Sequence, residues 1–224
     1  ASGKDALIPI GINVETVMPT LSEVDDLRSE LLGAAGGRLF VQFGNIYEGK
    51  QPFKVLEAFC EYKKLGGDGR LVFIGSTIET GDFKPSDFQA ACRNAGSEDD
   101  VLLLGGIRDE ALIGRYVAAS DAVFGLYSDG LSARRSAFLY TAQFGTTLFT
   151  TVPASESEYS AMPGVRERQG IVWFDVTVEP RALAQAMMGL PDYQFMRYPP
   201  IPTVGWDEVG RLHAQLYDQI VGDG

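Results

Sequence analysis

A glycine-rich turn that carries a single lysine is the first segment of this sequence with the chemistry to bind phosphate. Residues 44–51 read GNIYEGKQ and lie between an apolar run and a segment with helical spacing. A Walker A loop has a similar order but needs Ser or Thr after its lysine to hold magnesium, whereas this chain has Gln51. We therefore expect no nucleoside triphosphatase site. Two interpretations stay open: Lys50 points at a phosphate bound at a helix start, or it is a solvated lysine in an ordinary turn.

A second candidate anion site reads YSDGLSARRS, starting at position 127. Ser132 or Asp129 can cap a helix that begins there, and Gly130 lets the backbone approach a ligand closely. Free backbone N–H groups at a helix start, together with Arg134 and Arg135, have the chemistry to hold a diphosphate. The alternative interpretation is a solvated helix start without a ligand.

Other polar residues give weaker signals. Residues 105–108 (GGIR) follow an apolar run and would either let a planar base approach the backbone or form a tight turn. The acidic residues 98–100 are expected to cap a solvated loop rather than to bind a metal. Cys60 and Cys92 lie in separate helical segments and are expected to be packed thiols, and with one histidine the chain has too few ligands for zinc. A packed, hydrogen-bonded role is expected for His213 ahead of a catalytic one.

The elements that position these residues alternate along the chain. Apolar runs typical of buried strands occur at residues 39–43, 71–75, 101–104, 122–127, 147–151 and 171–174. Segments with helical spacing lie between or after them, at residues 53–64, 86–94, 110–119, 134–144 and 179–188. Outside this repeat are a strand-like piece at 7–13, a helix around 21–32 and a final amphipathic helix at 206–221. Continuous apolar strands separated by helices predict an α/β fold with a Rossmann-like, doubly wound parallel sheet of about six strands.

The composition indicates an acidic globular protein. The chain has 224 residues, of which 45% are hydrophobic and 22% charged, and its net charge is −11. The negative charge argues against nucleic acid as a partner, because neutralising phosphates along a strand requires a basic face. A few converging cations can still attract a small anion. No apolar run approaches the ~20 residues of a membrane-spanning helix, so we expect no transmembrane segment and a cytoplasmic location.

Taken in order, these segments resemble the C-terminal domain of retaining GT-B glycosyltransferases of the "glycosyl transferases group 1" family, which includes bacterial polysaccharide glycosyltransferases and sucrose synthase. The similar segments are residues 8–13 (family IPNGVD), 44–51 (GRxxxxKG), 71–75 (LxxxG), 101–121 (VxxxG…AAD), 129–135 (DGxSxRR of one bacterial subgroup), 144–148 and 206–217 (WDxIAxxHxxLY). The resemblance covers about residues 7–221. Each motif is loose alone, but their common order is fairly specific.

The resemblance implies roles for individual residues. Lys50 would bind the diphosphate of a nucleotide-sugar donor, and Gly130, Leu131 and Ser132 would offer backbone N–H groups to the same phosphates. The loop at Ile107 would hold the nucleobase. Further residues expected near the donor are Gly44, Asn45 and Asp129.

Two positions depart from the family pattern. The arginine of the family turn is Asn45 here, which removes one phosphate-binding fork. The family's Glu-x7-Glu pair would start near Asp129 and end at Ala137, so the carboxylate that normally accepts hydrogen bonds from the donor ribose is missing. Our hypothesis is that Arg134 or Arg135 partly compensates for Asn45 by contacting the diphosphate.

The function implied by the resemblance is hexosyl transfer, with retention, from a UDP-, GDP- or ADP-sugar to a glycan, lipid or small-molecule acceptor, as in bacterial polysaccharide biosynthesis. The protein would stabilise charge on the departing nucleoside diphosphate without a metal or other cofactor. We expect residues 1–38 to be an interdomain strand and linker helix, 39–197 the donor-binding domain, and 198–224 a Pro-rich connector and closing helix. The family's N-terminal, acceptor-binding domain, to which the closing helix would cross, has no counterpart in these segments.

The chain is therefore expected to be inactive, or nearly so, without such a domain, and the full enzyme could associate with a membrane surface peripherally. The alternative is a non-catalytic nucleotide or sugar-nucleotide binding module with a degenerate glycosyltransferase site. An epimerase of similar fold is disfavoured because the chain has one histidine. A dinucleotide oxidoreductase is disfavoured because no GxGxxG follows the first strand.

Overall fold

A six-stranded parallel sheet forms the centre of the protein in the computed structural model, which describes residues 10–33, 36–95, 100–162, 164–201, 203 and 205–222. The strand order is β3-β2-β1-β4-β5-β6 and all neighbours are parallel. The strands are β1 (Arg38–Phe43), β2 (Gly69–Ile74), β3 (Val101–Gly105), β4 (Ala122–Gly125), β5 (Thr147–Thr151) and β6 (Ile171–Phe174). The predicted doubly wound, Rossmann-like sheet is confirmed.

The apolar runs form strands because both faces of the sheet are covered. In β1, Leu39, Phe40 and Val41 are fully buried although their side chains alternate between faces. Phe40 pairs with Leu71 of β2 on one side and with Ala122 of β4 on the other. Burial on both faces explains why these strands read as continuous apolar runs rather than alternating ones.

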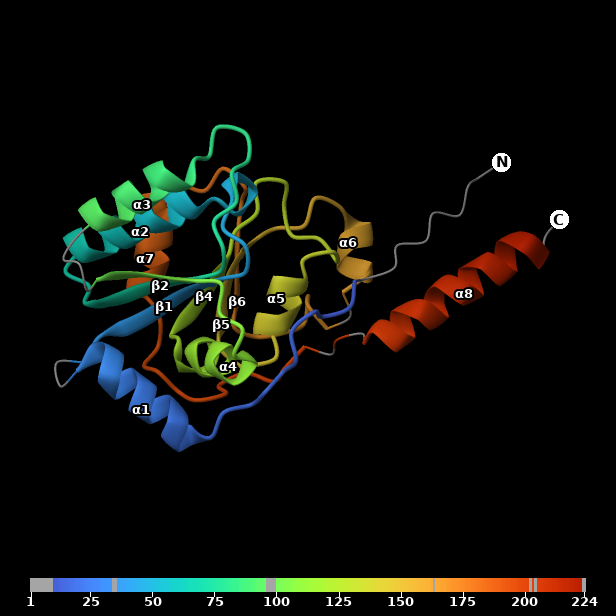
Figure 1. Cartoon of the computed structure of the whole chain (residues 1–224), viewed down its shortest axis with the longest axis horizontal. Coiled ribbons are helices and arrows are strands. Elements are labelled where there is room, and N and C mark those ends of the chain that lie inside the picture. Colours follow the sequence, from blue (N-terminus) through green and yellow to red (C-terminus); the bar gives the residue numbers. More distant parts are fainter. Residues whose placement is uncertain are drawn as a thin grey trace.

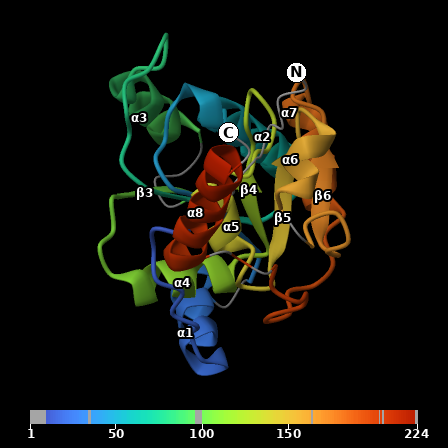
Figure 2. The ribbon, with the colours of Figure 1, turned by 90° about the vertical axis from the view of Figure 1, so that its right-hand side faces the viewer.

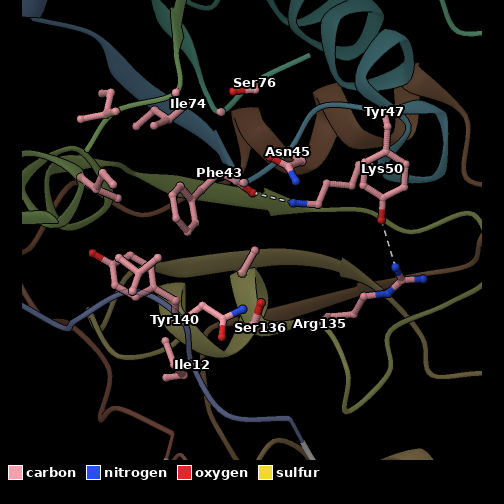
Figure 3. A pocket seen from close by; sticks show the side chains of 18 of the residues that line it. Ile12, Phe43, Asn45, Tyr47, Lys50, Ile74, Ser76, Arg135, Ser136 and Tyr140 are labelled. Carbon is pink, nitrogen blue, oxygen red and sulfur yellow. Dashed lines mark hydrogen bonds between the residues drawn. The ribbon is translucent and has the colours of Figure 1, made fainter. Parts of the chain in front are cut away.

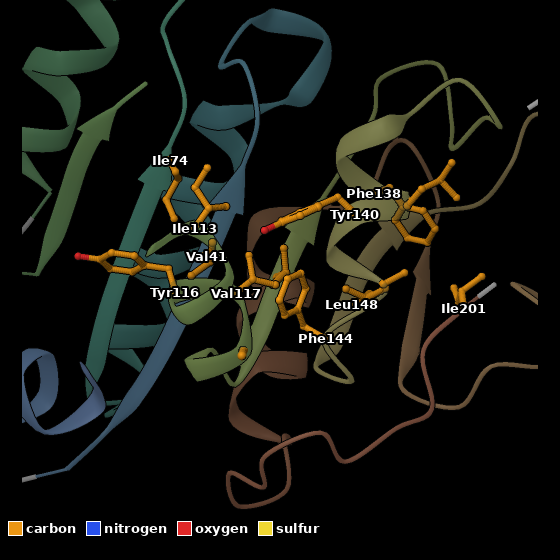
Figure 4. Close-up of a cluster of buried hydrophobic side chains, with 14 of the residues drawn as sticks. Val41, Ile74, Ile113, Tyr116, Val117, Phe138, Tyr140, Phe144, Leu148 and Ile201 are labelled. Atoms are coloured by element: carbon orange, nitrogen blue, oxygen red, sulfur yellow. The ribbon is translucent and has the colours of Figure 1, made fainter. Parts of the chain in front are cut away.

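Helices pack in one layer on each face of the sheet (Figures 1 and 2). One layer contains α2 (Pro52–Lys64), α3 (Pro85–Asn94) and α7 (Pro180–Met188), whose apolar side chains join one core cluster. The other layer contains α1 (Leu21–Leu32), α4 (Glu110–Ala119) and the short α5 (Ser136–Thr141). Figure 4 shows the core of this second layer, where side chains of β1, β2, α4 and α5 converge. Both cysteines are free; Cys92 is buried, as expected of a packed thiol, whereas Cys60 is half-buried.

Buried Asp121, directly before β4, ties the second layer to the sheet. Its carboxylate accepts hydrogen bonds from Arg28 of α1 at 2.9 Å, from Arg38 of β1 at 3.0 Å and from the backbone N–H of Leu39 at 2.8 Å. Only 2% of the Asp121 side chain is exposed, so these three donors replace its hydration. This cluster fixes the start of β1 beside the start of β4. The two strands then run in parallel toward their carboxyl ends.

The last helix, α8 (Trp206–Gly222), projects away from the sheet (Figure 1). At its first residue the indole N–H of Trp206 donates to the carbonyl of Ile12 at 3.1 Å. Half of the Trp206 surface is exposed, and so is most of Tyr217 further along the helix. Within the part of the chain that is described, no helix is long and apolar enough to cross a membrane.

Three local expectations need correction, and one short helix was not expected. The strand expected at 7–13 lies partly outside the described residues, and residues 10–13 are not in a strand. The fourth strand ends at Gly125 rather than at 127, because the N–H of Tyr127 donates to the side-chain hydroxyl of Thr151 instead of to a backbone carbonyl of the neighbouring strand. The helix expected at 134–144 covers only α5, and a further short helix, α6 (Glu156–Ser160), was not expected.

Candidate functional site

A pocket of about 440 Å³ opens at the carboxyl ends of β1 and β4 (Figure 3). These two strands are neighbours, yet the chain leaves β1 toward β2 and leaves β4 toward β5, so their connections diverge. In an open parallel sheet this divergence leaves a crevice between the two turns, which is where such folds bind ligands. The turn after β1 forms one wall and the segment leading into α5 forms the other, with residues 12–14 beside it.

Lys50 is a buried cation in the first wall. It ends the short 3-10 helix η1 (Glu48–Lys50), 7% of its surface is exposed, and its Nζ donates to the carbonyl of Phe43 at 2.9 Å. The side-chain amide of Gln42, in β1, donates to the Lys50 carbonyl at 2.8 Å and so fixes this turn to the strand. Burial, and next the positive charge of Arg135, lower the pKa of the Lys50 ammonium to about 8. The interpretation of Lys50 as a solvated lysine is therefore wrong.

Gly44 makes room for the Lys50 ammonium. A Cβ atom at position 44 would lie 2.4 Å from Nζ, and the backbone there has φ +93°, a conformation that favours glycine. Asn45, the next residue, also lines the pocket. The predicted turn at 44–51 thus places its glycine, its asparagine and its lysine around one cavity.

Arg135 is the main cation of the opposite wall, and the protein engages it on several sides. Its Nη1 donates to the hydroxyl of Tyr47 at 3.1 Å, and its Nη2 donates to Asp129. The guanidinium lies over the ring of Tyr127, 4.6 Å from the ring centroid. The contact with Tyr47 joins the two walls of the pocket (Figure 3). Arg134 also lines the pocket but is exposed, and no ion pair among the described residues involves it.

The predicted phosphate-binding loop at 130–132 does not line the pocket, although the arginines after it do. Gly130 has φ +85°, and a Cβ there would lie 2.7 Å from the carbonyl of Val152, so this glycine is required by the next loop. Leu131 is fully buried in the core. The carbonyl of Ser132 accepts the N–H of Arg135, which closes a turn ahead of the helix.

The expected helix caps are also corrected. Helix α5 begins at Ser136, and neither Asp129 nor Ser132 caps it; its N-cap position is Arg135, without a side-chain cap. Asp129 pairs with Arg135 instead. The backbone N–H of Ala133 is taken by the Glu158 carboxylate of α6 at 2.7 Å.

The pocket is cationic although the protein is strongly acidic. Lys50, Arg134 and Arg135 line it, and none of the described lining residues is Asp or Glu. Apolar and aromatic side chains form the remaining walls, among them Phe43, Ile74, Ile107, Tyr127 and Tyr140. A cavity with converging cations and apolar walls suits a ligand that combines an anionic group with a flat or apolar body.

Comparison with solved structures identifies the fold. WaaG, described as a glycosyltransferase involved in lipopolysaccharide biosynthesis, superposes with a TM-score of 0.59 at 17% identity over 80% of this chain and 45% of its own. The C-terminal domain of LpcC from Francisella tularensis, a glycosyl transferase group 1 family protein, gives 0.59 at 17% identity over 80% of this chain and 86% of its own. Anabaena HepE, solved with UDP-glucose, gives a TM-score of 0.58 at 17% identity over 80% of this chain and 45% of its own. This chain has the fold of a GT-B glycosyltransferase C-terminal domain.

The similarity is visible in structure rather than in sequence. No protein-family model matches the chain, and no curated protein sequence matches it either. The chain spans less than half the length of the WaaG and HepE chains that it matches. The fold is therefore established at low identity, and the chemistry of the pocket has to be argued from its own side chains.

Of the residues singled out from the sequence, the structure brings Gly44, Asn45, Lys50, Ile107, Arg134 and Arg135 together around the pocket. Ala137, where the family pattern has a carboxylate, lines it as well. His213 lies on α8, where its Nδ1 is 2.9 Å from the carbonyl of Val209, and its side chain is exposed rather than packed. No cluster of three metal-binding side chains occurs among the described residues.

Sequence reasoning missed three tyrosines of the site. Tyr47 and Tyr127 hold Arg135, and Tyr140 is fully buried with a hydroxyl that has no hydrogen-bond partner among the described residues. Burial raises the pKa of the Tyr140 phenol above its ordinary value, so this hydroxyl stays protonated. Tyr47 and Tyr127 lie within the two predicted motifs, but their type alone gives no indication of a role, because tyrosines occur throughout protein cores.

Proposed function

We propose that this chain binds a nucleotide-sugar through its diphosphate and is the donor-binding part of a retaining glycosyltransferase. The observation that carries the proposal is the buried Lys50 ammonium, which faces a pocket lined by two arginines and, among the described residues, by no carboxylate. A buried ammonium is unfavourable without a counterion. A diphosphate would supply that counterion, and the pocket lies at the strand ends where this fold binds ligands.

The diphosphate would lie between the two walls. Lys50 would contact it from the β1 turn, while Arg134 and Arg135 would contact it from the segment before α5. Arginine forks hold phosphate oxygens bidentately, and hydrogen bonds between charged partners are about twice as strong as neutral ones. The pocket has no carboxylate among its described residues with which to hold a magnesium ion, so we propose that the grip needs no metal.

The remaining walls would receive the rest of the donor. Gly106 and Ile107, after β3, would lie against the nucleobase, since a glycine next to an apolar side chain leaves space for a flat ring. Ala137 stands where a carboxylate would accept from the ribose, so the ribose hydroxyls would have a weaker partner here. HepE, at 17% identity, was solved with UDP-glucose, which makes a UDP-sugar the first donor to test.

In the reaction we propose, the cations stabilise the charge that develops on the departing nucleoside diphosphate. The leaving phosphate would help to deprotonate the acceptor on the same face of the sugar, which gives retention. The acceptor would bind in a part of the enzyme that this chain does not match, because the chain covers 45% of WaaG and of HepE. Transfer to a glycan, lipid or small-molecule acceptor by such an enzyme in the cytoplasm is part of this proposal.

Binding is tested by isothermal titration and thermal shift with UDP-, GDP- and ADP-sugars, each with EDTA and with magnesium. We expect stabilisation that follows RT ln(1 + [L]/Kd), equal with and without metal. Arg134→Ala and Arg135→Ala should each raise the Kd, whereas Arg166→Ala, which removes an exposed arginine paired with Glu156 outside the pocket, should not. No shift with any nucleotide-sugar, or unchanged affinity in both pocket variants, would refute the proposed grip.

A non-catalytic binding module is the second candidate, and Asn45 and Ala137 favour it because both lack a group that the family pattern uses. The two candidates differ in turnover and not in binding. Transfer of radiolabelled sugar from the preferred donor should be measured with this chain and with the longest natural form of the protein. Release of nucleoside diphosphate with sugar in the product supports the enzyme. Tight donor binding without any release from the longest form supports the module.

A further inference from the structure

Asp129 forms an ion pair with Arg135, and a phosphate that binds the same guanidinium nitrogen would have to displace this carboxylate. Both carboxylate oxygens of Asp129 contact the same guanidinium nitrogen, Nη2. The neighbouring Nε–H is buried and has no acceptor among the described residues. Nε and Nη2 form the lateral fork with which arginine binds phosphate or carboxylate bidentately. Asp129 therefore occupies Nη2 of this fork, whereas Nε has no hydrogen-bond acceptor among the described residues.

The two partners differ in how firmly they are held. The Asp129 side chain is 65% exposed, so it can turn into water and be solvated, while only 21% of the Arg135 side chain is exposed. The ring of Tyr127 lies beneath the guanidinium and is fully buried in the core. The guanidinium can therefore keep its cation–π contact with Tyr127 while Nη2 exchanges one anion for another.

We propose that Asp129 is a placeholder anion: it holds Arg135 while the pocket is empty and gives way to a ligand phosphate. The inference rests on the proposed function and names a residue that sets its affinity. The phosphate would take Nε and Nη2 together, which satisfies the buried N–H that Asp129 leaves unpaired. Tyr47 keeps Nη1 throughout, so the arginine stays joined to the opposite wall of the pocket.

A placeholder role and a positioning role of Asp129 predict opposite changes in ligand affinity when Asp129 is removed. If Asp129 merely oriented Arg135 toward the ligand, its removal would weaken binding. If Asp129 competes with the ligand, its removal strengthens binding. An exposed ion pair contributes little, so we expect a gain of about two- to fivefold in affinity.

The test is the Kd of UDP, measured by titration for the wild-type chain, Asp129→Asn and Asp129→Ser. Both variants should bind UDP about two- to fivefold more tightly. Glu61→Gln is the matched control, because it removes an equal charge from another ion pair, with Lys64, outside the pocket. Its Kd should equal that of the wild type. An unchanged or higher Kd in both Asp129 variants overturns the proposal.

A double-mutant cycle shows whether the gain passes through Arg135. Arg135→Met should weaken UDP binding, and adding Asp129→Asn to it should then have no further effect. A gain that persists without Arg135 would mean that Asp129 acts through the general field of the protein, and would overturn the proposal. If the wild type binds no UDP at all, the proposed function itself fails. If it binds UDP and only the Asp129 variants behave otherwise, the placeholder role alone fails.

Discussion

Replacing Lys50 by Met should stabilise the empty protein and weaken its binding of nucleotide-sugars. In the empty pocket the ammonium has one carbonyl partner, and its pKa falls from 10.5 to about 8. At about 1.4 kcal/mol per pH unit, that difference corresponds to about 3 kcal/mol against the charged form. Because the unfolded chain binds this proton more tightly, the penalty on the folded state is complete below pH 8 and is relieved as the pH rises toward 10.5.

The methionine removes the penalty but also leaves the Phe43 carbonyl without its donor. An unsatisfied buried acceptor costs about 1–3 kcal/mol. At pH 7 we therefore expect Lys50→Met to raise the free energy of unfolding by up to about 2 kcal/mol. Above pH 10.5 the wild-type lysine is neutral in both states. There the variant should be the less stable protein.

The affinity for the ligand should fall with rising pH, whereas the stability of the empty protein should rise. A diphosphate beside Lys50 raises its pKa again, so binding above pH 8 requires proton uptake. The wild-type affinity for a UDP-sugar should therefore fall by up to about tenfold per pH unit above 8, until it reaches that of Lys50→Met. The variant should show a flat pH profile. Urea unfolding at pH 7 and 9.5, and titrations over the same range, measure both effects.

Lys54 offers a matched control, because its ammonium also donates to a backbone carbonyl, that of Val176 at 3.1 Å, but does not line the pocket. Lys54→Met should leave the binding of UDP-sugars unchanged at every pH. If Lys50→Met were less stable than the wild type at pH 7 and gained as much stability from the ligand as the wild type does, the reasoning about the buried ammonium would be refuted.

Three further changes test other parts of the site and its support. Gly44→Ala should lower the free energy of unfolding by about 1–3 kcal/mol in urea, and it should raise the Kd for UDP because the added Cβ displaces Lys50. Gly66→Ala is the control: this glycine also has a positive φ but open space around its Cβ, so the Kd for UDP should not change. Ala137→Glu should increase the preference for UDP over a 2′,3′-dideoxy analogue by about tenfold, because it adds an acceptor for the ribose; equal preference in both proteins would contradict this. Asp121→Asn should lower the free energy of unfolding by about 3 kcal/mol or more with the Kd unchanged, and a loss below 1 kcal/mol would contradict the buried cluster.

The sheet could be predicted from the sequence because its signal is local. A strand buried on both faces reads as an apolar run wherever it occurs, and the runs at 147–151 and 171–174 match β5 and β6 residue for residue. The helix at 110–119 matches α4 in the same way. The ends of other elements were less predictable because distant groups decide them. The Thr151 hydroxyl, which is 24 residues away from Tyr127, takes the N–H that would have extended β4.

The candidate site could be predicted only in part for the same reason. The turn that carries Lys50 is set by its own glycines, so the pattern located it correctly. The loop after β4 looked like a phosphate-binding helix start, but Glu158 of α6 takes the N–H of Ala133, and Asp129 takes the guanidinium of Arg135. These carboxylates lie 25 and 6 residues from the groups they bind. No local pattern shows which of the many acidic residues of this chain will make such contacts.

Lys50 and Arg135, the two main cations of the pocket, differ in how their charge is balanced when no ligand is bound. This difference affects the selectivity between one and two phosphates. Lys50 is desolvated and repelled by Arg135, so any anion that reaches it gains from relieving both effects. Arg135 is already neutralised by Asp129, so only an anion that binds better than a carboxylate gains there. On the proposed binding mode, we expect a single phosphate to contact one of these cations and a diphosphate to contact both. UMP should therefore bind much more weakly than UDP to the wild type, and the ratio of their affinities should shrink in Lys50→Met. Titration of both nucleotides measures this ratio, and an equal ratio in the two proteins would mean that Lys50 does not take part in recognising the second phosphate.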